Sequence, residues 1–191
     1  MATIDYIRQQ IRDSAATKEA MQENCAGDIA QAAELLLAAV KAGKKILWCG
    51  NGGSAADAQH LSAELVGKLR QIRKPVASLA LTTDTSFLTA WVNDADPDLI
   101  FARQVEALGA PGDVLVGITT SGNSPNVIAA ISTARDQGLK TVVFCGGTGG
   151  RLGRTADVTI IIPAGDTQRI QEGHILTGHI ICDLIEQAVL G

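Results

Sequence analysis

The feature that most constrains this chain is a regular alternation of short apolar runs with segments of helical periodicity. Five runs rich in Val, Ile and Leu are each followed by a helical pattern or a turn, which predicts an α/β fold. Consecutive βα units join as parallel strands through right-handed crossovers, so we expect a three-layer αβα sandwich around a five-stranded parallel sheet. The expected strands are 45–49, 76–81, 113–118, 141–145 and 157–162, and the expected helices are 54–68, 85–108, 125–137, a short turn near 150, and 167–189.

Two further helices are expected before the first strand. Apolar side chains recur at helical spacing between residues 3 and 43, first at Ile4, Ile7 and Ile11 and again from Ile29 onward. A prefix of this kind often packs against a partner subunit. No repeat, low-complexity stretch or linker rich in Pro, Gly or Ser divides the chain. Residues 1–191 are therefore expected to form one domain with an N-terminal helical extension over 1–43.

Composition narrows the range of partners and compartments. Apolar residues make up 46% of the chain but aromatic residues only 3%, so small aliphatic side chains must fill the core, which suits buried parallel strands. A net charge of -4 gives no basic surface for nucleic acid. The N-terminus lacks a basic segment followed by an apolar stretch, and no apolar run approaches the ~20 residues of a membrane helix. Four scattered cysteines without a Cys-x-x-Cys pair suit a reducing compartment, so we expect a cytoplasmic protein with no membrane or nucleic-acid partner.

The first expected strand ends in a glycine-rich loop, Gly-Asn-Gly-Gly-Ser-Ala-Ala over residues 50–56. Glycines let the backbone approach a ligand closely, and Ser54 stands where a helix N-cap is expected, so the loop suits an anion. The same letters also fit a relaxed dinucleotide-binding pattern, Gly-x-Gly-x-x-Ala, or an ordinary tight turn. The loop alone does not decide among these alternatives.

The third expected strand ends in a hydroxyl-rich loop, residues 119–125. Its hydroxyl groups belong to Thr119, Thr120, Ser121 and Ser124, and Pro125 follows at a position that suits the first turn of a helix. Hydroxyls and free backbone N–H groups suit a phosphate monoester. An ordinary N-capped helix explains one of these hydroxyls but not all of them.

The expected strand order decides how the two loops are related. In the flavodoxin-like order 2-1-3-4-5, strands one and three are neighbours and their following helices lie on opposite faces, so both loops border one crevice. A nicotinamide dinucleotide does not need the second loop, and Asp84 lies beyond the roughly 20 residues at which the dinucleotide pattern places its acid. A sugar phosphate is therefore favoured over NAD.

A third polar segment lies in the helical stretch after the second expected strand. Asn93 and Asp94 carry groups that suit sugar hydroxyls. The run Asn-Asp-Ala-Asp-Pro equally fits a turn, and both interpretations stay open.

Chemistry-bearing side chains gather on the first and last helices of the sheet region. His60 and Glu64 are four residues apart and share one helix face near the glycine-rich loop, although such a pair is more often a surface hydrogen bond. The last helix adds Gln171, His174 and His179. On an ideal helix Gln171 and His179 are separated by roughly 12 Å of rise, so they meet one metal only by reaching toward each other or with a neighbouring chain.

Together these segments resemble the sugar isomerase (SIS) family, in particular its branch that isomerises seven-carbon sugar phosphates. The resemblance covers nearly the whole chain and rests on four segments. These are residues 49–60 with Glu64, 88–94, 119–124, and 169–174 with His179. The local departure is Thr119, where family members often have serine, and the hydroxyl is retained.

The resemblance implies an aldose-ketose isomerase that converts sedoheptulose 7-phosphate to D-glycero-D-manno-heptose 7-phosphate through an enediolate. This is the first step toward nucleotide-activated heptose for lipopolysaccharide or other surface glycans. It also implies a homotetramer with one Zn²⁺ per subunit. By position, the implied zinc ligands are His60, Glu64, Gln171 and His179. The implied substrate-binding residues are Asn51, Gly52, Gly53, Ser54, Glu64, Asn93, Asp94, Thr119, Thr120, Ser121, Ser124 and Gln171.

Isomerisation needs a base at the carbon beside the carbonyl and an acid at oxygen, and we assign Glu64 as the base and His179 as the acid. A carboxylate bound to zinc is a poorer base, so Glu64 has to loosen its metal bond during turnover. One alternative is a non-catalytic SIS protein that binds the bacterial replication initiator. Those relatives lack the acid at the Glu64 position and the histidine at the His179 position, whereas this chain has both. Another alternative is a sugar-phosphate sensor that binds without converting.

Overall fold

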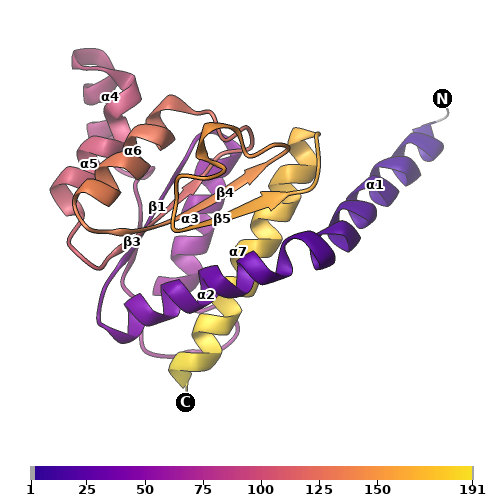
Figure 1. The fold of residues 1–191 in the computed structure, drawn as a ribbon, viewed down its shortest axis with the longest axis horizontal. Coiled ribbons are helices and arrows are strands. Elements are labelled where there is room, and N and C mark those ends of the chain that lie inside the picture. Colours follow the sequence, from indigo (N-terminus) through magenta and orange to yellow (C-terminus); the bar gives the residue numbers. More distant parts are fainter. Residues whose placement is uncertain (1–2, 191) are drawn as a thin grey trace.

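The computed structural model describes residues 3–190. Its five strands form one parallel sheet in the order β2-β1-β3-β4-β5 (Figure 1), as predicted. The strands are β1 (Ile46–Gly50), β2 (Ser78–Ala80), β3 (Val114–Ile118), β4 (Lys140–Gly146) and β5 (Val158–Ile162). The helices are α1 (Thr3–Asn24), α2 (Ala26–Lys41), α3 (Gly53–Val66), α4 (Thr85–Asp94), α5 (Ile100–Leu108), α6 (Pro125–Asp136) and α7 (Thr167–Leu190), with 3-10 turns η1 (Pro97–Leu99) and η2 (Gly150–Leu152).

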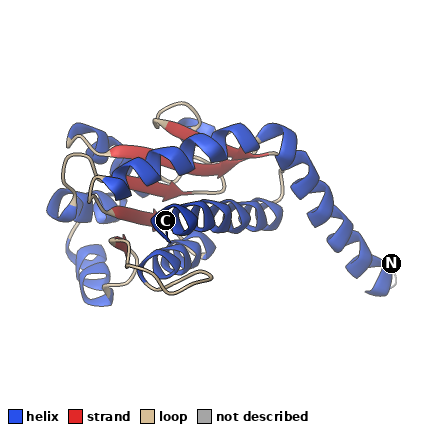
Figure 2. Cartoon of the chain, turned by 90° about the horizontal axis from the view of Figure 1, so that it is seen from below, coloured by secondary structure: helices blue, strands red, loops and turns tan. Residues whose placement is uncertain are grey.

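Alternate residues of each strand point to opposite faces of the sheet and meet different helices there. In β1, Trp48 packs with α2, α3 and α7, whereas Leu47 packs with α5 and α6. Figure 2 shows the strands between helices on both sides. The predicted αβα sandwich is therefore confirmed, and α3 and α6, which follow the neighbouring strands β1 and β3, lie on opposite faces.

Two expected elements differ from the structure. The helical stretch 85–108 is not continuous, because α4 ends at Asp94 and α5 begins at Ile100. Pro97 disfavours helical backbone at Asp96, whose carboxylate instead accepts a hydrogen bond from the N–H of Asp98 at 2.9 Å. The expected strand 76–81 is also shorter, since only Ser78–Ala80 pairs with β1.

Helix α1 extends away from the sheet and its covering helices (Figures 1 and 2). Met21 is its buried residue, and Ile4, Tyr6, Ile7 and Ile11 are all exposed. These side chains give α1 an apolar surface that the chain itself leaves uncovered. No helix between residues 3 and 190 combines the length and the apolar character that crossing a bilayer requires.

Helices α3 and α7 approach each other closely, because α7 carries a glycine where it meets α3. A Cβ atom added at Gly178 of α7 would lie 2.3 Å from a δ-carbon of Leu61, which is fully buried on α3. The same helix packs against β5 at Gly173, where an added Cβ would lie 2.7 Å from Ile162. Glycine at these positions therefore lets α7 lie directly on its neighbours.

We expect Gly178→Ala to destabilise the protein by about 1–3 kcal/mol, because the new methyl group has to displace Leu61 in a packed interface. Gly27→Ala is the matched control. Gly27 lies on α2 with no atom within 4 Å of an added Cβ, so this change is expected to be neutral or to stabilise by up to about 1 kcal/mol. Urea unfolding monitored by circular dichroism measures both. Equal stabilities of the two variants would contradict the tight contact.

Candidate active site between α3, α7 and the strand ends

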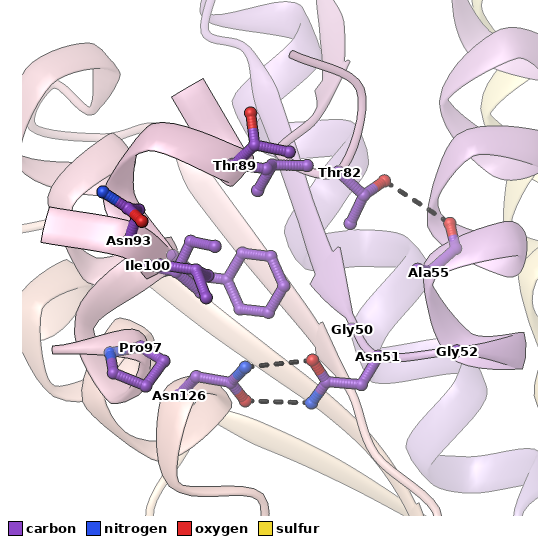
Figure 3. Close-up of a pocket in the computed structure, with 13 residues that line it drawn as sticks. Gly50, Asn51, Gly52, Ala55, Thr82, Thr89, Asn93, Pro97, Ile100 and Asn126 are labelled. Atoms are coloured by element: carbon purple, nitrogen blue, oxygen red, sulfur yellow. Dashed lines mark hydrogen bonds between the residues drawn. The ribbon is translucent and has the colours of Figure 1, made fainter. Parts of the chain in front are cut away.

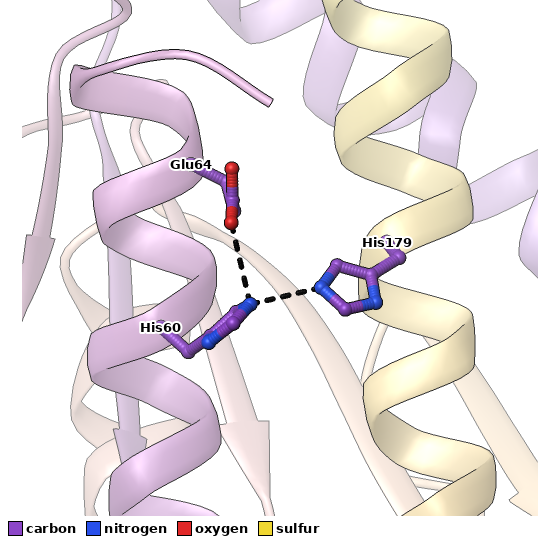
Figure 4. Close-up of side chains that lie close together, drawn as sticks. All are labelled: His60, Glu64 and His179. Atoms are coloured by element: carbon purple, nitrogen blue, oxygen red, sulfur yellow. Dashed lines mark hydrogen bonds and ion pairs between the residues drawn. The ribbon is translucent and has the colours of Figure 1, made fainter. Parts of the chain in front are cut away.

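His60 and Glu64 on α3 and His179 on α7 form a three-residue cluster (Figure 4). The Nε2 atom of His60 lies 3.3 Å from Oε1 of Glu64 and 2.9 Å from Nε2 of His179. All three donor atoms lie within 4.8 Å of one another. His60 is exposed, whereas Glu64 and His179 are half-buried, so the cluster is open to a ligand from solvent.

The cluster has the donor types and spacing of a zinc site. Two imidazole nitrogens 2.9 Å apart either share a proton or both face a cation. With Zn–N distances near 2.0–2.1 Å, neighbouring ligands of a tetrahedral zinc lie about 3.3 Å apart. The His60–Glu64 separation of 3.3 Å equals this value and the His60–His179 separation of 2.9 Å is somewhat shorter, and nitrogen and carboxylate oxygen are ordinary zinc ligands. The donor types of these residues therefore fit the metal that the family resemblance implies.

Gln171 belongs to α7 and lies beside the glycine-rich loop at the point where this loop enters α3. A Cβ added at Gly53 would lie 2.5 Å from the Nε2 atom of Gln171, so the Gln171 amide rests directly on the loop backbone. A side chain at residue 53 would therefore collide with Gln171 of α7, and glycine avoids this collision. The role of Gln171 as a fourth zinc ligand stays a prediction.

The interpretation of Ser54 as a helix N-cap is wrong. Gly52 precedes the helix, with φ of 55°, and α3 begins at Gly53. Ser54 lies inside the first turn, buried against Gly50, where an added Cβ would lie 2.8 Å from that of Ser54. Gly52 has a positive φ, which glycine adopts without strain, and the helix therefore starts earlier than a serine cap at residue 54 would place it.

The hydroxyl-rich loop is internally hydrogen-bonded. The buried Thr119 hydroxyl lies 2.9 Å from that of Ser124, and the N–H of Asn123 donates to the Ser121 hydroxyl at 3.1 Å. Ser124 precedes α6, and Pro125 begins it, as expected. Thr120 is half-buried beside this pair.

A reciprocal amide pair joins the glycine-rich loop to the first turn of α6 across the crevice. Asn51 and Asn126 each donate from Nδ2 to the other's Oδ1 at 2.9 Å (Figure 3). The pair confirms that the loops after β1 and β3 face each other. Sequence reasoning missed Asn126, although its place directly after the hydroxyl-rich loop was a usable signal.

The same pair lines a pocket of about 730 Å³ between the glycine-rich loop and α4. Of the predicted substrate-binding residues, Asn51, Gly52 and Asn93 line it. Asp94 does not line it and accepts a hydrogen bond from Asn93 at 2.6 Å. The other lining residues are Gly50, Ala55, Thr82, Leu88, Thr89, Val92, Pro97, Ile100, Phe101 and Asn126. Helix α3 connects the pocket, at Ala55, with the cluster at His60.

Two titratable groups outside the predicted set lie near these elements. Burial raises the pKa of Asp57 to about 6, although His60 nearby acts to lower it. Burial lowers the pKa of His174 to about 4, and its Nε2 atom lies 3.1 Å from the carbonyl oxygen of Cys145. His174 is fully buried, so it is a neutral core residue and not a member of the cluster.

Comparisons with known proteins define the class. The sequence profile of the SIS domain matches residues 9–146, and the chain belongs to the SIS domain family. Solved structures under 25% identical, such as the sugar isomerase domain of an RpiR transcription factor from Sphaerobacter thermophilus, share the fold with a TM-score of 0.65.

Within that family the chain belongs to the phosphoheptose isomerases. It is 50% identical to the phosphoheptose isomerase of Aquifex aeolicus (strain VF5) over 97% of each chain. Identity to the enzyme of Azoarcus sp. (strain BH72) is 52% over 100% of this chain and 98% of the relative. The solved phosphoheptose isomerase of Neisseria gonorrhoeae has a TM-score of 0.91 at 44% identity, over 96% of this chain and 98% of that one. The chain is therefore an isomerase.

Asn126→Ala is expected to raise KM about 10-fold for the sugar phosphate, because Asn51 loses the partner that fixes its amide at the pocket wall. Ser132→Ala, an exposed change on the same helix, is the control. Steady-state kinetics of both variants make the test. An unchanged KM for Asn126→Ala would remove the amide pair from substrate binding.

Proposed function

We propose that this protein converts sedoheptulose 7-phosphate to D-glycero-D-manno-heptose 7-phosphate, the entry to nucleotide-activated heptose for lipopolysaccharide or other surface glycans. The observation that carries this proposal is the cluster of a carboxylate and two imidazoles, His60, Glu64 and His179, near a pocket whose wall includes three asparagine amides. Identity near 50% to enzymes named phosphoheptose isomerase supports the substrate.

In the proposed mechanism Glu64 takes a proton from C1 of the ketose while His179 donates a proton to the oxygen on C2, which gives the enediol. Glu64 then delivers a proton to C2, and His179 takes up the proton of the C1 hydroxyl, which leaves the aldehyde at C1. Glu64 and His179 stand on two different helices, so they can act on adjacent atoms of one substrate. Half-burial of both side chains limits water around the reacting carbons while leaving an entry path.

The two loops are proposed to hold the ends of the substrate. Hydroxyls and N–H groups of the hydroxyl-rich loop suit the phosphate. The proposed hydrogen-bond donors to the phosphate are Thr119, Thr120, Ser121 and Ser124 of this loop and Ser54 of α3. Asn51, Gly52, Gly53, Asn93, Asp94 and Gln171 suit the sugar hydroxyls. The pocket wall formed by Asn51, Gly52 and Asn93 supports this assignment.

His60, Glu64, Gln171 and His179 are proposed to hold one Zn²⁺ per subunit. Bound there, zinc would supply positive charge that stabilises the developing enediolate oxygen. His60 transfers no proton in this scheme, and its proposed role is to bind the metal.

We further propose a cytoplasmic homotetramer, in which residues 1–191 act as one domain. The uncovered apolar face of α1, with Ile4, Ile7 and Ile11 exposed, supports association of copies. A net charge of -4 supports the absence of a nucleic-acid partner.

A sensor or a protein that binds the replication initiator is the alternative. Retention of Glu64 and His179 at hydrogen-bonding and ion-pairing distance from His60 favours catalysis. Incubation with sedoheptulose 7-phosphate and chromatographic detection of an aldose product separates the two. Ligand binding without product would support the sensor.

Glu64→Gln is expected to lower kcat about 10²- to 10⁴-fold while fold and substrate binding are kept, because the amide cannot accept the proton. Glu106→Gln, a change of an exposed carboxylate on α5, is the matched control and should leave the rate unchanged. An unaltered rate for Glu64→Gln would remove this residue from the mechanism.

Elemental analysis of the purified protein is expected to find about one zinc per chain. The double variant His60→Ala/His179→Ala is expected to contain almost no zinc, because two of the ligands are lost. His174→Gln is the control, since His174 is buried in the core. Full zinc content in the double variant would contradict the site.

A further inference from the structure

We propose that Arg73 and Glu186 are positioning residues that fix the last turn of α3, which carries Glu64, at its distance from His179 on α7. The inference rests on the proposed function. Neither residue belongs to the cluster or to the pocket, and both are buried, with 1% and 2% of their side chains exposed.

Glu186 binds the segment that leaves α3. It lies on α7, about two helical turns after His179, and its carboxylate accepts three backbone hydrogen bonds. The N–H groups of Leu69, Arg70 and Gln71 donate to it at 2.9, 2.8 and 3.0 Å. Three converging N–H donors fix a carboxylate in both position and orientation.

Arg73 binds the end of α3 itself. Its Nη2 donates to the carbonyl oxygen of Glu64 and its Nη1 to that of Leu65, both at 2.8 Å. These carbonyls belong to the last turn, where the helix offers them no N–H partner. The Nε atom of Arg73 makes no hydrogen bond and lies 3.4 Å from Oε2 of Glu186.

The contacts form a continuous path from the backbone of Glu64 through Arg73 and Glu186 to the helix of His179. The segment is otherwise held by the packing of Leu69 against the core and by the ion pair of Arg70 with Asp183, whereas Ile72 at its centre is 87% exposed. Burial alone would raise the pKa of Glu186, but its backbone hydrogen bonds and the charge of Arg73 outweigh burial and lower that pKa. The carboxylate is therefore ionised, as the path requires.

A buried ion pair is weak support for stability, because desolvation offsets much of the attraction. A planar guanidinium that bridges two carbonyls and a carboxylate is, however, geometrically specific. A misplacement of about 1 Å at a reacting group costs on the order of 100-fold in rate. Precise placement of Glu64 is therefore the property that this arrangement supplies.

The test uses Arg73→Lys and Glu186→Gln, which keep a charge or an acceptor oxygen and so preserve the fold better than truncation. Arg70→Ala is the matched control, because Arg70 pairs with Asp183 of α7 at 3.0 Å from the same segment but is 71% exposed. Each protein is loaded with Co²⁺. The affinity for Co²⁺, the visible spectrum of the bound ion, and kcat and KM for the sugar phosphate are measured well below the melting temperature of the protein.

We expect Arg73→Lys and Glu186→Gln to weaken Co²⁺ binding about 10- to 100-fold and to shift its visible spectrum. kcat is expected to fall by a similar factor with KM nearly constant, since substrate contacts are intact. Arg70→Ala should match the parent protein. A lower melting temperature with unchanged Co²⁺ affinity, spectrum and kcat would overturn the proposal and leave a purely structural pair. If the parent protein itself does not turn over, the proposed function fails, and the Co²⁺ measurements alone decide about positioning.

Discussion

The close approach of α3 and α7 is the constraint on which the candidate active site depends. Gly178 lets Leu61 lie against the α7 backbone, and on the same two helices His60 and His179 come within 2.9 Å of each other. Were the helices one side chain further apart, no single ion or substrate atom could contact both. The buried Arg73–Glu186 pair acts at the other end of the same contact, so packing and chemistry rest on one interface.

The sheet supplies the second half of the site through its strand order. Because β1 and β3 pair directly, the loops that follow them leave the sheet side by side while their helices go to opposite faces. The amide pair of Asn51 and Asn126 closes the resulting crevice. Helix α3 then links crevice and cluster, since it begins at the glycine-rich loop and carries His60 and Glu64 in its later turns.

Periodic patterns gave the fold correctly, because burial of parallel strands leaves a strong apolar signal in each one. Local departures came from single residues: Pro97 divides the stretch 85–108, and Gly52 displaces the cap from Ser54. Contacts between distant segments left no such signal. Gln171 against Gly53 and Arg73 against Glu186 depend on how α7 lies across α3, which no local pattern encodes. Residue roles in binding and catalysis stay predictions.

The most direct test of the account follows the proton that Glu64 is proposed to move. The protein is incubated with sedoheptulose 7-phosphate in deuterium oxide, and the aldose product is analysed by nuclear magnetic resonance. A carboxyl group that is partly exposed, as Glu64 is at 20%, exchanges its proton with solvent, so deuterium is expected at C2 of the product. Product without deuterium at C2, formed by the parent protein and at an undiminished rate by Glu64→Gln, would contradict proton transfer through Glu64.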